Sequence, residues 1–391
     1  MALILKTDIQ RFITKNLDCN ISELALQKNP FPAVDYKLIL NQIESKSKSR
    51  KKLPTWFNCV NIIYPAKISI EQTSSEQTAV YKSTLISGKN LIDLTGGFGV
   101  DAYYFSKKIE NVIHCESNSE LSAIAKHNFL QLKTNSITCF TEDSLLILKQ
   151  INQKFDWIYI DPSRRNGAKG KVFLLKDCLP DVPNNIDLYL NYTKNILLKT
   201  APILDISAGL SELKFVKKIH IVALENEVKE LLWEIEKDYD GQIEIKTINL
   251  LKDNNQEFNF FNNSENISST FGTLEKYLYE PNAAIMKSGG FVEVATRFKV
   301  TKLHQHSHLY ISNNLIEFPG RRFEIKQSFL YNKIEMTRNL KNTKINITTR
   351  NFPDTVQTIR KKWNIKEGGD EYCFFSTDAL NNKIALICKK I

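Results

Sequence analysis

The sequence predicts an α/β fold, in which a mixed sheet of about seven strands is flanked by an N-terminal helical region and small α+β C-terminal modules. Three observations predict this class. A short apolar strand runs into a glycine-rich turn at residues 90–102, strand and helix patterns alternate from about residue 71 to residue 260, and several of the strands end in an acidic residue.

The glycine-rich turn is the stretch around which the chain is organised. Leu91 to Leu94 has the apolar pattern of a buried parallel strand. Gly96, Gly97 and Gly99 allow a sharp turn and a close approach of the backbone to a ligand. A helix is expected to begin near Val100.

Two classes of ligand fit such a turn. Gly97-x-Gly99-x-x-Ala102 matches a dinucleotide fingerprint, with Glu116 about twenty residues on as the ribose carboxylate. Asp93 favours the other class, because a carboxylate there repels a pyrophosphate but attracts the amino group of S-adenosylmethionine.

The next strands also end in acids. Residues 112–116 end on Glu116, residues 136–141 precede Asp143, and residues 155–161 end on Asp161. Because ligands bind at the carboxyl edge of an open α/β sheet, these acids and Asp93 are expected to converge on one crevice. The alternatives are an ordinary surface role for Glu116 and a helix cap for Asp143.

Asp93-Leu-Thr-Gly-Gly-Phe-Gly99 resembles motif I of class I S-adenosylmethionine-dependent methyltransferases, although Thr95 departs from the usual glycine pattern. The longer run from Leu91 to Asp101 resembles a bacterial group of these enzymes with a C-terminal THUMP-like domain. The resemblance implies a Rossmann-like methyltransferase domain over residues 71–265. It also implies cofactor-binding residues, namely Asp93 for the amino group, Thr95, Gly96, Gly97 and Gly99 in the turn, Glu116 for the ribose and Asp143 for the adenine.

Asp161-Pro162-Ser163-Arg164 occupies the place of motif IV, where the substrate meets the methyl group. The resemblance assigns these four residues to catalysis, with Asp161 orienting the nucleophile. Ser163 replaces the second proline of the amine methyltransferases and Arg164 their aromatic residue, so an exocyclic amine is not implied. Arg164 and Arg165 are candidates to stack on a base or hold a phosphate. The alternative is a basic loop paired with neighbouring acids.

The other elements follow the same alternation. The pattern predicts one helix over residues 68–82, further alternating segments at 194–198, 201–206 and 218–224, a helix over 225–237 and a last strand at 243–248. Residues 166–171 are expected to form a loop over the site.

Charge separates the ends of the chain from its middle. The net charge is +10, of which residues 270–391 carry about +9 and residues 1–80 about +4. Basic flanks around a less basic centre favour a polyanionic partner, and a lysine-rich solvated surface is the alternative. Scattered cysteines and the lack of a long apolar run lead us to expect a cytoplasmic protein without a metal or membrane.

The C-terminal region resembles the two small modules of the family, a ferredoxin-like module at 270–338 and a THUMP-like module at 339–391, after an N-terminal helical region at 1–70. The candidate RNA contacts there are basic residues, namely Arg321, Arg322, Arg350, Arg360 and Lys361. His304, His306 and His308 are expected to share one face of a strand, a spacing that can bind a metal, although no further ligand cluster accompanies them.

These patterns predict a methyltransferase that uses S-adenosylmethionine and acts on RNA, either tRNA or rRNA. An NAD-dependent oxidoreductase and a catalytically silent RNA-binding protein remain as alternatives. The first gives no role to Asp93 or Asp161, and the second predicts RNA retention without methyl transfer.

Overall fold

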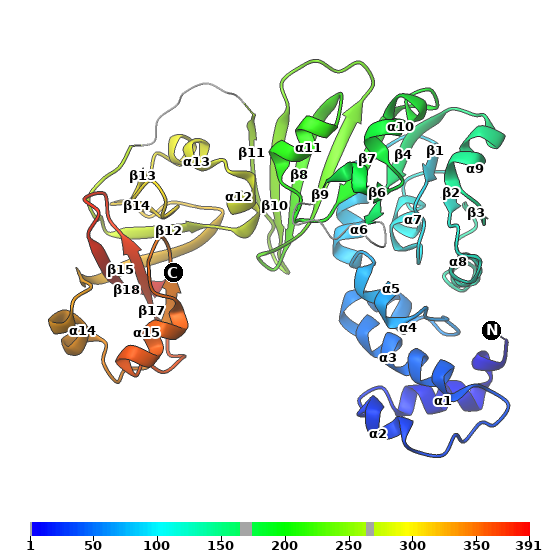
Figure 1. Cartoon of the computed structure of the whole chain (residues 1–391), viewed down its shortest axis with the longest axis horizontal. Helices are drawn as coiled ribbons and strands as arrows, with labels where there is room; N and C mark the ends of the chain where they lie inside the picture. Colours follow the sequence, from blue (N-terminus) through cyan, green and yellow to red (C-terminus); the bar gives the residue numbers. More distant parts are fainter. Residues whose placement is uncertain (1, 165–173, 263–269) are drawn as a thin grey trace. The chain divides into compact units, whose positions relative to one another are not determined.

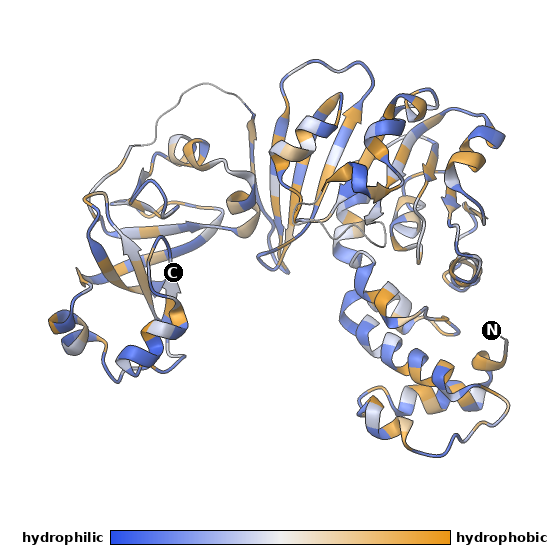
Figure 2. Cartoon of the chain, in the orientation of Figure 1, coloured by the Kyte–Doolittle hydropathy of each residue, from blue (hydrophilic) through white to orange (hydrophobic). Residues whose placement is uncertain are grey.

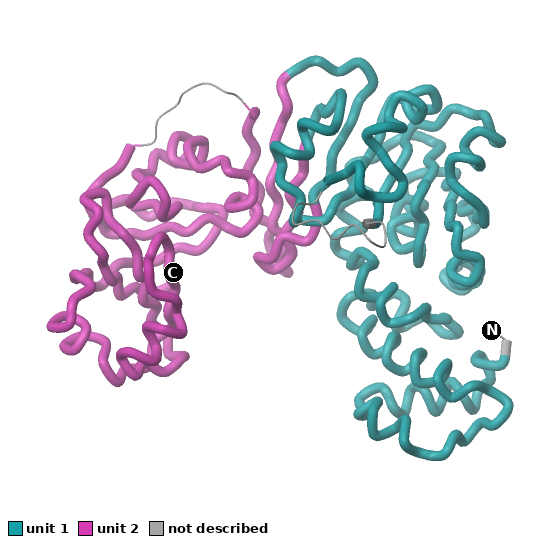
Figure 3. The backbone as a smooth tube through the Cα atoms, in the orientation of Figure 1, with its two compact units in different colours: residues 1–218, 231–241 teal, residues 219–230, 242–391 magenta. Residues whose placement is uncertain are grey.

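The computed structural model describes residues 2–164, 174–262 and 270–391. It divides the chain into two compact units, which Figure 3 distinguishes by colour. Unit 1 comprises residues 1–218 and 231–241, and unit 2 comprises residues 219–230 and 242–391. The chain passes from unit 1 into unit 2 after residue 218, in one strand of a hairpin, and returns to unit 1 at residue 231, in the other strand. No helix among the described residues combines the length and apolar character needed to cross a lipid bilayer.

Unit 1 begins with a group of helices, drawn in blue in Figure 1. Its helices are η1 (Ala2–Leu5), α1 (Thr7–Lys15), α2 (Ile21–Ala25), α3 (Tyr36–Lys52), α4 (Pro54–Asn58), α5 (Lys67–Gln72), α6 (Glu76–Ser83), α7 (Val100–Phe105), α8 (Ser119–Gln131), α9 (Ser144–Ile151), η2 (Leu175–Asp177), α10 (Val182–Tyr189) and α11 (Ile206–Glu212). Its strands are β1 (Asn90–Asp93), β2 (Asn111–Cys115), β3 (Ile137–Phe140), β4 (Phe155–Ile160), β5 (Ser163–Arg164), β6 (Cys178–Leu179) and β7 (Thr193–Thr200). The strands β8 (Val216–Leu224) and β9 (Glu227–Glu236) belong to both units.

The large sheet has the order β11-β10-β8-β9-β7-β4-β1-β2-β3. Strands β3, β2, β1, β4 and β7 run parallel to one another, whereas β9 is antiparallel to β7. The predicted class, an α/β protein with a mixed sheet, is therefore confirmed. The order reverses direction on either side of β1, so β1 and β4 meet where ligands bind in open α/β sheets.

The sheet has nine strands rather than about seven, because two segments differ from the prediction. The segment predicted as a helix over 225–237 is β9. Glu225 and Asn226 both have positive φ, 50° and 65°, as in a tight hairpin turn. Leu231 to Trp233 are all buried. A strand covered on both faces therefore has consecutive apolar residues, a pattern that a buried helix shares. The second extra strand is β11 (Gln256–Phe261), in a polar segment.

The single helix predicted over residues 68–82 is two helices, α5 and α6. Thr73 ends α5 in an extended conformation, and the Ser75 side chain caps α6 by accepting the N–H of Thr78 at 3.2 Å. Serine competes with helical hydrogen bonding through its own side chain, which explains the interruption.

The N-terminal helices are joined to the sheet layer of unit 1 by buried polar contacts. The Asn128 side chain of α8 pairs with both backbone groups of Ile63, at 2.9 and 2.8 Å. The Gln42 side chain of α3 does the same with Tyr64, at 2.9 and 2.6 Å. The buried backbone groups of Ile63 and Tyr64 need hydrogen-bond partners, and the Asn128 and Gln42 side chains supply them. These bonds hold the segment 62–65 between the N-terminal helices and the sheet layer. Figure 2 shows α3 with both hydrophilic and hydrophobic stretches, as an amphipathic helix requires.

Unit 2 is built on a second sheet, of order β13-β14-β12-β15-β18-β17-β16. Its further strands are β10 (Glu244–Leu250), β11, β12 (Tyr277–Pro281), β13 (Thr301–Lys302), β14 (Tyr310–Ser312), β15 (Gly320–Leu330), β16 (Asn346–Thr349), β17 (Glu371–Thr377) and β18 (Lys383–Lys390). Its helices are α12 (Ala283–Ser288), α13 (Phe291–Phe298), α14 (Lys333–Asn339) and α15 (Val356–Trp363). Leu278, Phe323 and Phe374 form part of one buried core of this sheet.

The three histidines predicted to share a strand face lie instead in a turn between β13 and β14. His304 accepts a hydrogen bond from the Asn351 side chain at 2.9 Å, and the His308 ring stacks on Phe291 with centroids 3.6 Å apart. His308 has a φ of 50°, which no regular strand allows. Within the residues that the structure describes, no cluster of His, Cys, Asp or Glu side chains is arranged to hold a metal ion.

Candidate functional site at the ends of β1 and β4

The glycines of the turn after β1 are required for different structural reasons. A Cβ on Gly96 would lie 2.3 Å from Nε2 of His114, and one on Gly99 would lie 2.4 Å from Cζ of Phe129. Both positions are therefore closed to side chains by packing inside the protein. Gly97 has a φ of 56°, and a Cβ there would have only the Thr95 carbonyl within reach, at 3.8 Å. Gly97 is thus the glycine of the turn that faces open space.

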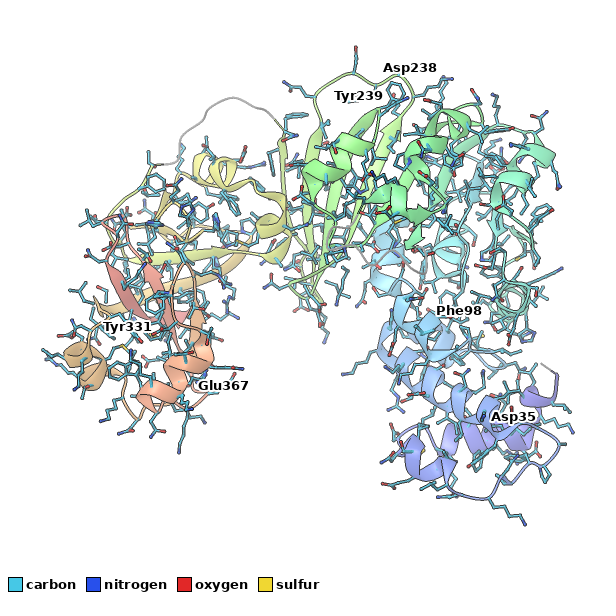
Figure 4. The ribbon with its side chains drawn as sticks, viewed as in Figure 1. Asp35, Phe98, Asp238, Tyr239, Tyr331 and Glu367 are labelled. Carbon is cyan, nitrogen blue, oxygen red and sulfur yellow. The ribbon has the colours of Figure 1, made fainter. Side chains whose placement is uncertain are left out.

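Phe98 fixes the turn from the side of the N-terminal helices. Its ring, labelled in Figure 4, is buried and lies 6.2 Å from that of Trp56 and 6.4 Å from that of Tyr64. Contacts between aromatic rings at these distances are favourable. The N-terminal helices therefore contribute to the shape of the turn.

Asp93, the last residue of β1, is a buried acid, only 1% exposed. Its Oδ1 accepts hydrogen bonds from the N–H and the hydroxyl of Thr95, at 2.9 and 3.3 Å. Burial raises its pKa well above the usual value, the charges of Asp101 and Asp161 raise it further, and the two bonds from Thr95 offset this only in part. Among the described residues, no cation pairs with Asp93. A positively charged group of a ligand would supply the missing counter-charge.

Asp101, in the first turn of α7, shows the contrasting case. Its carboxylate lies 3.1 Å from the buried ammonium of Lys82 and accepts hydrogen bonds from Ser74 and Tyr159, both at 2.8 Å. Burial acts to raise its pKa, but the charges of Lys82 and Lys199 and the two hydroxyl donors outweigh burial and lower it. Asp101 is therefore an ionised, structurally paired acid that connects α6, α7 and β4.

Asp161 follows β4 and is joined to β1 through Thr95. Its backbone N–H donates to the Thr95 hydroxyl at 2.7 Å, and its Oδ2 lies 2.5 Å from the ammonium of Lys199 on β7. The Lys199 side chain is 11% exposed and that of Asp161 33%. Lys199 thus occupies one oxygen of Asp161 from inside the sheet, while a third of the carboxylate side chain stays accessible.

Residues 162–164 lead away from Asp161 along a short strand. Ser163 pairs with Leu179 and Arg164 with Cys178 in the antiparallel ladder of β5 and β6. Pro162 lies between Asp161 and this ladder. Arg165 and the predicted loop at 166–171 lie outside the described residues, so the proposed roles of Arg164 and Arg165 stay predictions.

Glu116 follows β2 and contacts the glycine turn directly. Its Oε2 accepts the N–H of Gly97 at 2.9 Å, and its Oε1 accepts the N–H of Asn118 at 2.7 Å. The acid predicted to bind a ribose is therefore held beside the glycine that faces open space. Because its oxygens also accept backbone bonds, Glu116 orients the turn.

Asp143 caps α9. It is exposed, and its Oδ1 accepts the N–H groups of Leu145 and Leu146 at 2.9 and 3.2 Å. This is the alternative role that the sequence left open for it. An adenine contact through the second oxygen stays a prediction.

The residues that sequence reasoning missed are Lys82, Asp101 and Lys199. Lys199 had a detectable signal, since a lysine directly after the apolar run Ile196 to Leu198 is rarely buried unless it is paired. Lys82 and Asp101 gave no such signal, because their pairing depends on how α6 packs on α7.

The basic residues predicted to bind RNA in unit 2 have different environments. Arg321 and Arg350 both pair with the buried carboxylate of Glu280, through an Nε–Oε2 distance of 2.5 Å and an Nη2–Oε1 distance of 2.6 Å. Arg322 pairs with Glu317 at 2.5 Å. The remaining two lie on α15, where the Arg360 guanidinium points to the carbonyl of Ile345 at 3.4 Å and Lys361 is exposed. Lys361 therefore has the most accessible charge.

A mixed sheet whose parallel strands carry a glycine turn after β1 and acids at successive strand ends is the open α/β arrangement that binds nucleotide-type ligands at its carboxyl edge. A protein of known structure shares the whole architecture. It is a candidate methyltransferase from Porphyromonas gingivalis W83, 31% identical over 100% of this chain and 98% of that chain, with a TM-score of 0.88. The chain therefore belongs to the same family, the bacterial class I S-adenosylmethionine-dependent methyltransferases with a C-terminal THUMP-like domain.

Family models match the C-terminal part. Residues 277–319 match a ferredoxin-like domain and residues 320–390 a THUMP-like domain. Two more distant structures are a candidate methyltransferase from Streptococcus mutans in complex with SAH and an rRNA methylase from Streptococcus thermophilus. They are 13% and 10% identical, over 41% of this chain and 96% and 94% of theirs, with TM-scores of 0.31 and 0.30. No curated protein matches the sequence.

Proposed function

We propose that the protein transfers a methyl group from S-adenosylmethionine to RNA. The observation that carries the proposal is the contrast between two buried acids. Asp101 has Lys82 as its counter-ion, whereas Asp93, at the end of β1, has a raised pKa and no cation partner among the described residues. A cofactor with an amino group fits that position, and the pyrophosphate of NAD does not.

The donor set around Asp93 also fits this cofactor. Gly97 leaves space in front of the turn, and Glu116 lies beside it with a carboxylate that suits ribose hydroxyls. When bound, S-adenosylmethionine supplies an electrophilic methyl group. The acceptor must then approach in line, so the residues of the protein mainly position it and exclude water.

Asp161 is the residue we assign to positioning the acceptor. Its Oδ2 is held by Lys199 and its backbone by Thr95, so its direction is fixed from two sides. The accessible part of the carboxylate can accept a proton or a hydrogen bond from a nucleophilic N–H or O–H group. We therefore propose an acceptor site at the carboxyl end of β4, next to the proposed cofactor turn at the end of β1.

Two observations support RNA as the substrate class. Residues 320–390 match a THUMP-like domain, and the basic charge of the chain lies in its flanks, with about +9 in residues 270–391. A polyanionic substrate would account both for the THUMP-like domain and for the basic flanks. tRNA and rRNA are the RNA classes to test first.

The test is transfer of a labelled methyl group from S-adenosylmethionine to bulk RNA. We expect label that ribonuclease releases, and at least about a hundredfold less of it with Asp161→Asn. Undiminished RNA binding without methyl transfer by the wild-type protein would favour a silent RNA-binding protein. Binding of NAD in place of S-adenosylmethionine would favour an oxidoreductase.

A further inference from the structure

A groove crosses the N-terminal helices of unit 1, and none of the site residues described above lines it. Its volume is about 540 Å³, and residues from α1, from α3 and from the segment 57–61 line it. Its cationic members are Arg11, Lys15 and Lys46, and none of the described residues that line it is acidic. A volume in this range accommodates a specific ligand.

The face of α1 that borders the groove is polar because its opposite face is used for packing. Ile9 and Ile13 are buried. Arg11 and Lys15 lie four residues apart on the other side, both exposed. Like charges at this spacing repel each other. Among the described residues, neither forms an ion pair, so an anion between them would relieve the repulsion.

Lys46 is the most unusual of the three cations. It is half-buried, and burial lowers its pKa. Its neighbours on α3 have acidic partners, since Lys48 pairs with Glu71 and Arg50 pairs with Asp18 at 2.9 Å. Lys46 has no carboxylate partner among the described residues.

One aromatic ring lies beside these cations. The ammonium of Lys46 lies 5.9 Å from the ring centroid of Phe57, and the Arg50 guanidinium lies 5.5 Å from it. Asn58 and Asn61 continue the same wall of the groove. Unpaired cations, an aromatic ring and side-chain amides together provide contacts for phosphates, for base faces and for base edges. An acidic peptide would contact only the cations. RNA would also contact the aromatic ring and the side-chain amides, so it fits the groove better.

We propose that this groove binds single-stranded RNA, with Arg11, Lys15 and Lys46 on its phosphates and Phe57 against a base. The inference rests on RNA being the substrate of the proposed function. It adds a second RNA-binding surface, on the unit that carries the glycine turn. The segment that lines the groove continues to Tyr64, which packs on Phe98 of that turn.

The test measures binding of a short single-stranded RNA of mixed sequence to the full chain by fluorescence anisotropy, at several salt concentrations. We expect the double variant Lys15→Glu with Lys46→Glu to bind at least about tenfold more weakly. Its salt dependence should also be shallower, by about 1.4 in the slope of log K against log salt, because two phosphate contacts are lost.

The matched control is Lys37→Glu. Lys37 lies on the same helix as Lys46 and is exposed. The two are nine positions apart, so at about 100° per residue Lys37 lies on the opposite side of the helix. This control should bind RNA as the wild type does. Calorimetric titration with S-adenosylmethionine should give the same affinity for every variant, which shows that the fold is retained.

Wild-type RNA affinity and salt slope in the double variant would overturn the groove site and leave the proposed function intact. If the wild-type chain bound no RNA, both the RNA substrate and this site would be overturned. Retention of an acidic peptide by the wild type, lost with Lys46→Glu, would then assign the groove to a protein partner.

Discussion

The hydroxyl of Thr95 accepts a 2.7 Å hydrogen bond from the backbone N–H of Asp161. The same hydroxyl donates to Asp93 at 3.3 Å. Thr95 therefore connects the ends of β1 and β4, one of which faces the proposed cofactor and the other the proposed acceptor. The departure from the usual glycine pattern of motif I thus has a structural consequence, because a glycine at this position could make neither side-chain contact.

Replacing Thr95 should impair methyl transfer more than cofactor binding. Thr95→Val keeps the shape but removes the hydroxyl, which leaves the Asp161 N–H without its acceptor. We expect kcat to fall about 10- to 100-fold, because displacement of a positioning group has effects of this size. Thr95→Ser, which retains the hydroxyl, should keep most of the activity. Equal kcat values for the Val and Ser variants would show that the link is unimportant.

Lys199→Met should likewise lower kcat by about 10- to 100-fold, since Asp161 would lose the ammonium that holds its Oδ2. The KM for S-adenosylmethionine should change much less. The control is Lys214→Met, which breaks the exposed pair with Asp187 at 3.0 Å. A change in the cofactor KM alone would argue against a role at the acceptor.

Asp93→Asn should stabilise the protein without cofactor while abolishing cofactor binding. The folded-state pKa of Asp93 is raised above 3.8, so its ionisation costs stability increasingly as pH rises from that value toward the raised one. At neutral pH we expect the variant to have the higher free energy of unfolding, and near pH 3.8 this gain should vanish. S-adenosylmethionine should raise the Tm of the wild type only. A variant that is less stable at neutral pH would contradict the burial argument.

The pH dependence of stability should report on His114. Burial lowers the pKa of this histidine from 6.5 to about 4, so the unfolded chain binds a proton at a pH where the folded one does not. The contribution of His114 to stability should therefore be constant above pH 6.5 and fall by about 3 kcal/mol on the way down to pH 4. Urea unfolding of wild type and His114→Leu measures this, and the slope of the variant should be smaller. If stability depended on pH equally in the wild type and in His114→Leu, the pH dependence would not come from His114.

Glu280→Gln should destabilise unit 2, because Arg321 and Arg350 would lose their shared buried partner. We expect a loss of about 1–3 kcal/mol, since both arginines keep partial access to water. Differential scanning calorimetry would measure it, with Glu317→Gln as the control for an exposed pair. Consequently, RNA-binding losses in Arg321 or Arg350 variants need a stability measurement beside them. Lys361→Glu should weaken RNA binding without affecting stability.

The sequence predicted the class of fold and the strand ends at which the candidate residues lie, because both depend on local patterns. The strand before Gly96 and the acids Glu116 and Asp161 follow from apolar runs and strand ends. The strand β9 was wrongly predicted as a helix because burial on both faces removes the alternation that identifies a strand.

What the sequence could not predict are contacts between segments far apart in the chain. Gly96 is closed by His114 and Gly99 by Phe129, so Gly97 is the glycine of this turn that combines positive φ with open space. The pairing of Asp161 with Lys199 depends on the order β7-β4-β1 in the sheet. The pairing of Arg321 and Arg350 with Glu280 was likewise not predictable, because the sequence does not show that a basic residue has a partner inside the protein.

Calorimetric titration with S-adenosylmethionine and, separately, with NAD tests the central claim most directly. Wild type and Asp93→Asn are titrated in two buffers of different ionisation enthalpy. We expect the wild type to bind only S-adenosylmethionine and to release a proton on binding, because the cationic amino group favours the ionised form of Asp93. The variant should bind neither ligand. Absence of binding to S-adenosylmethionine by the wild type, or unchanged affinity in the variant, would contradict the cofactor site described here.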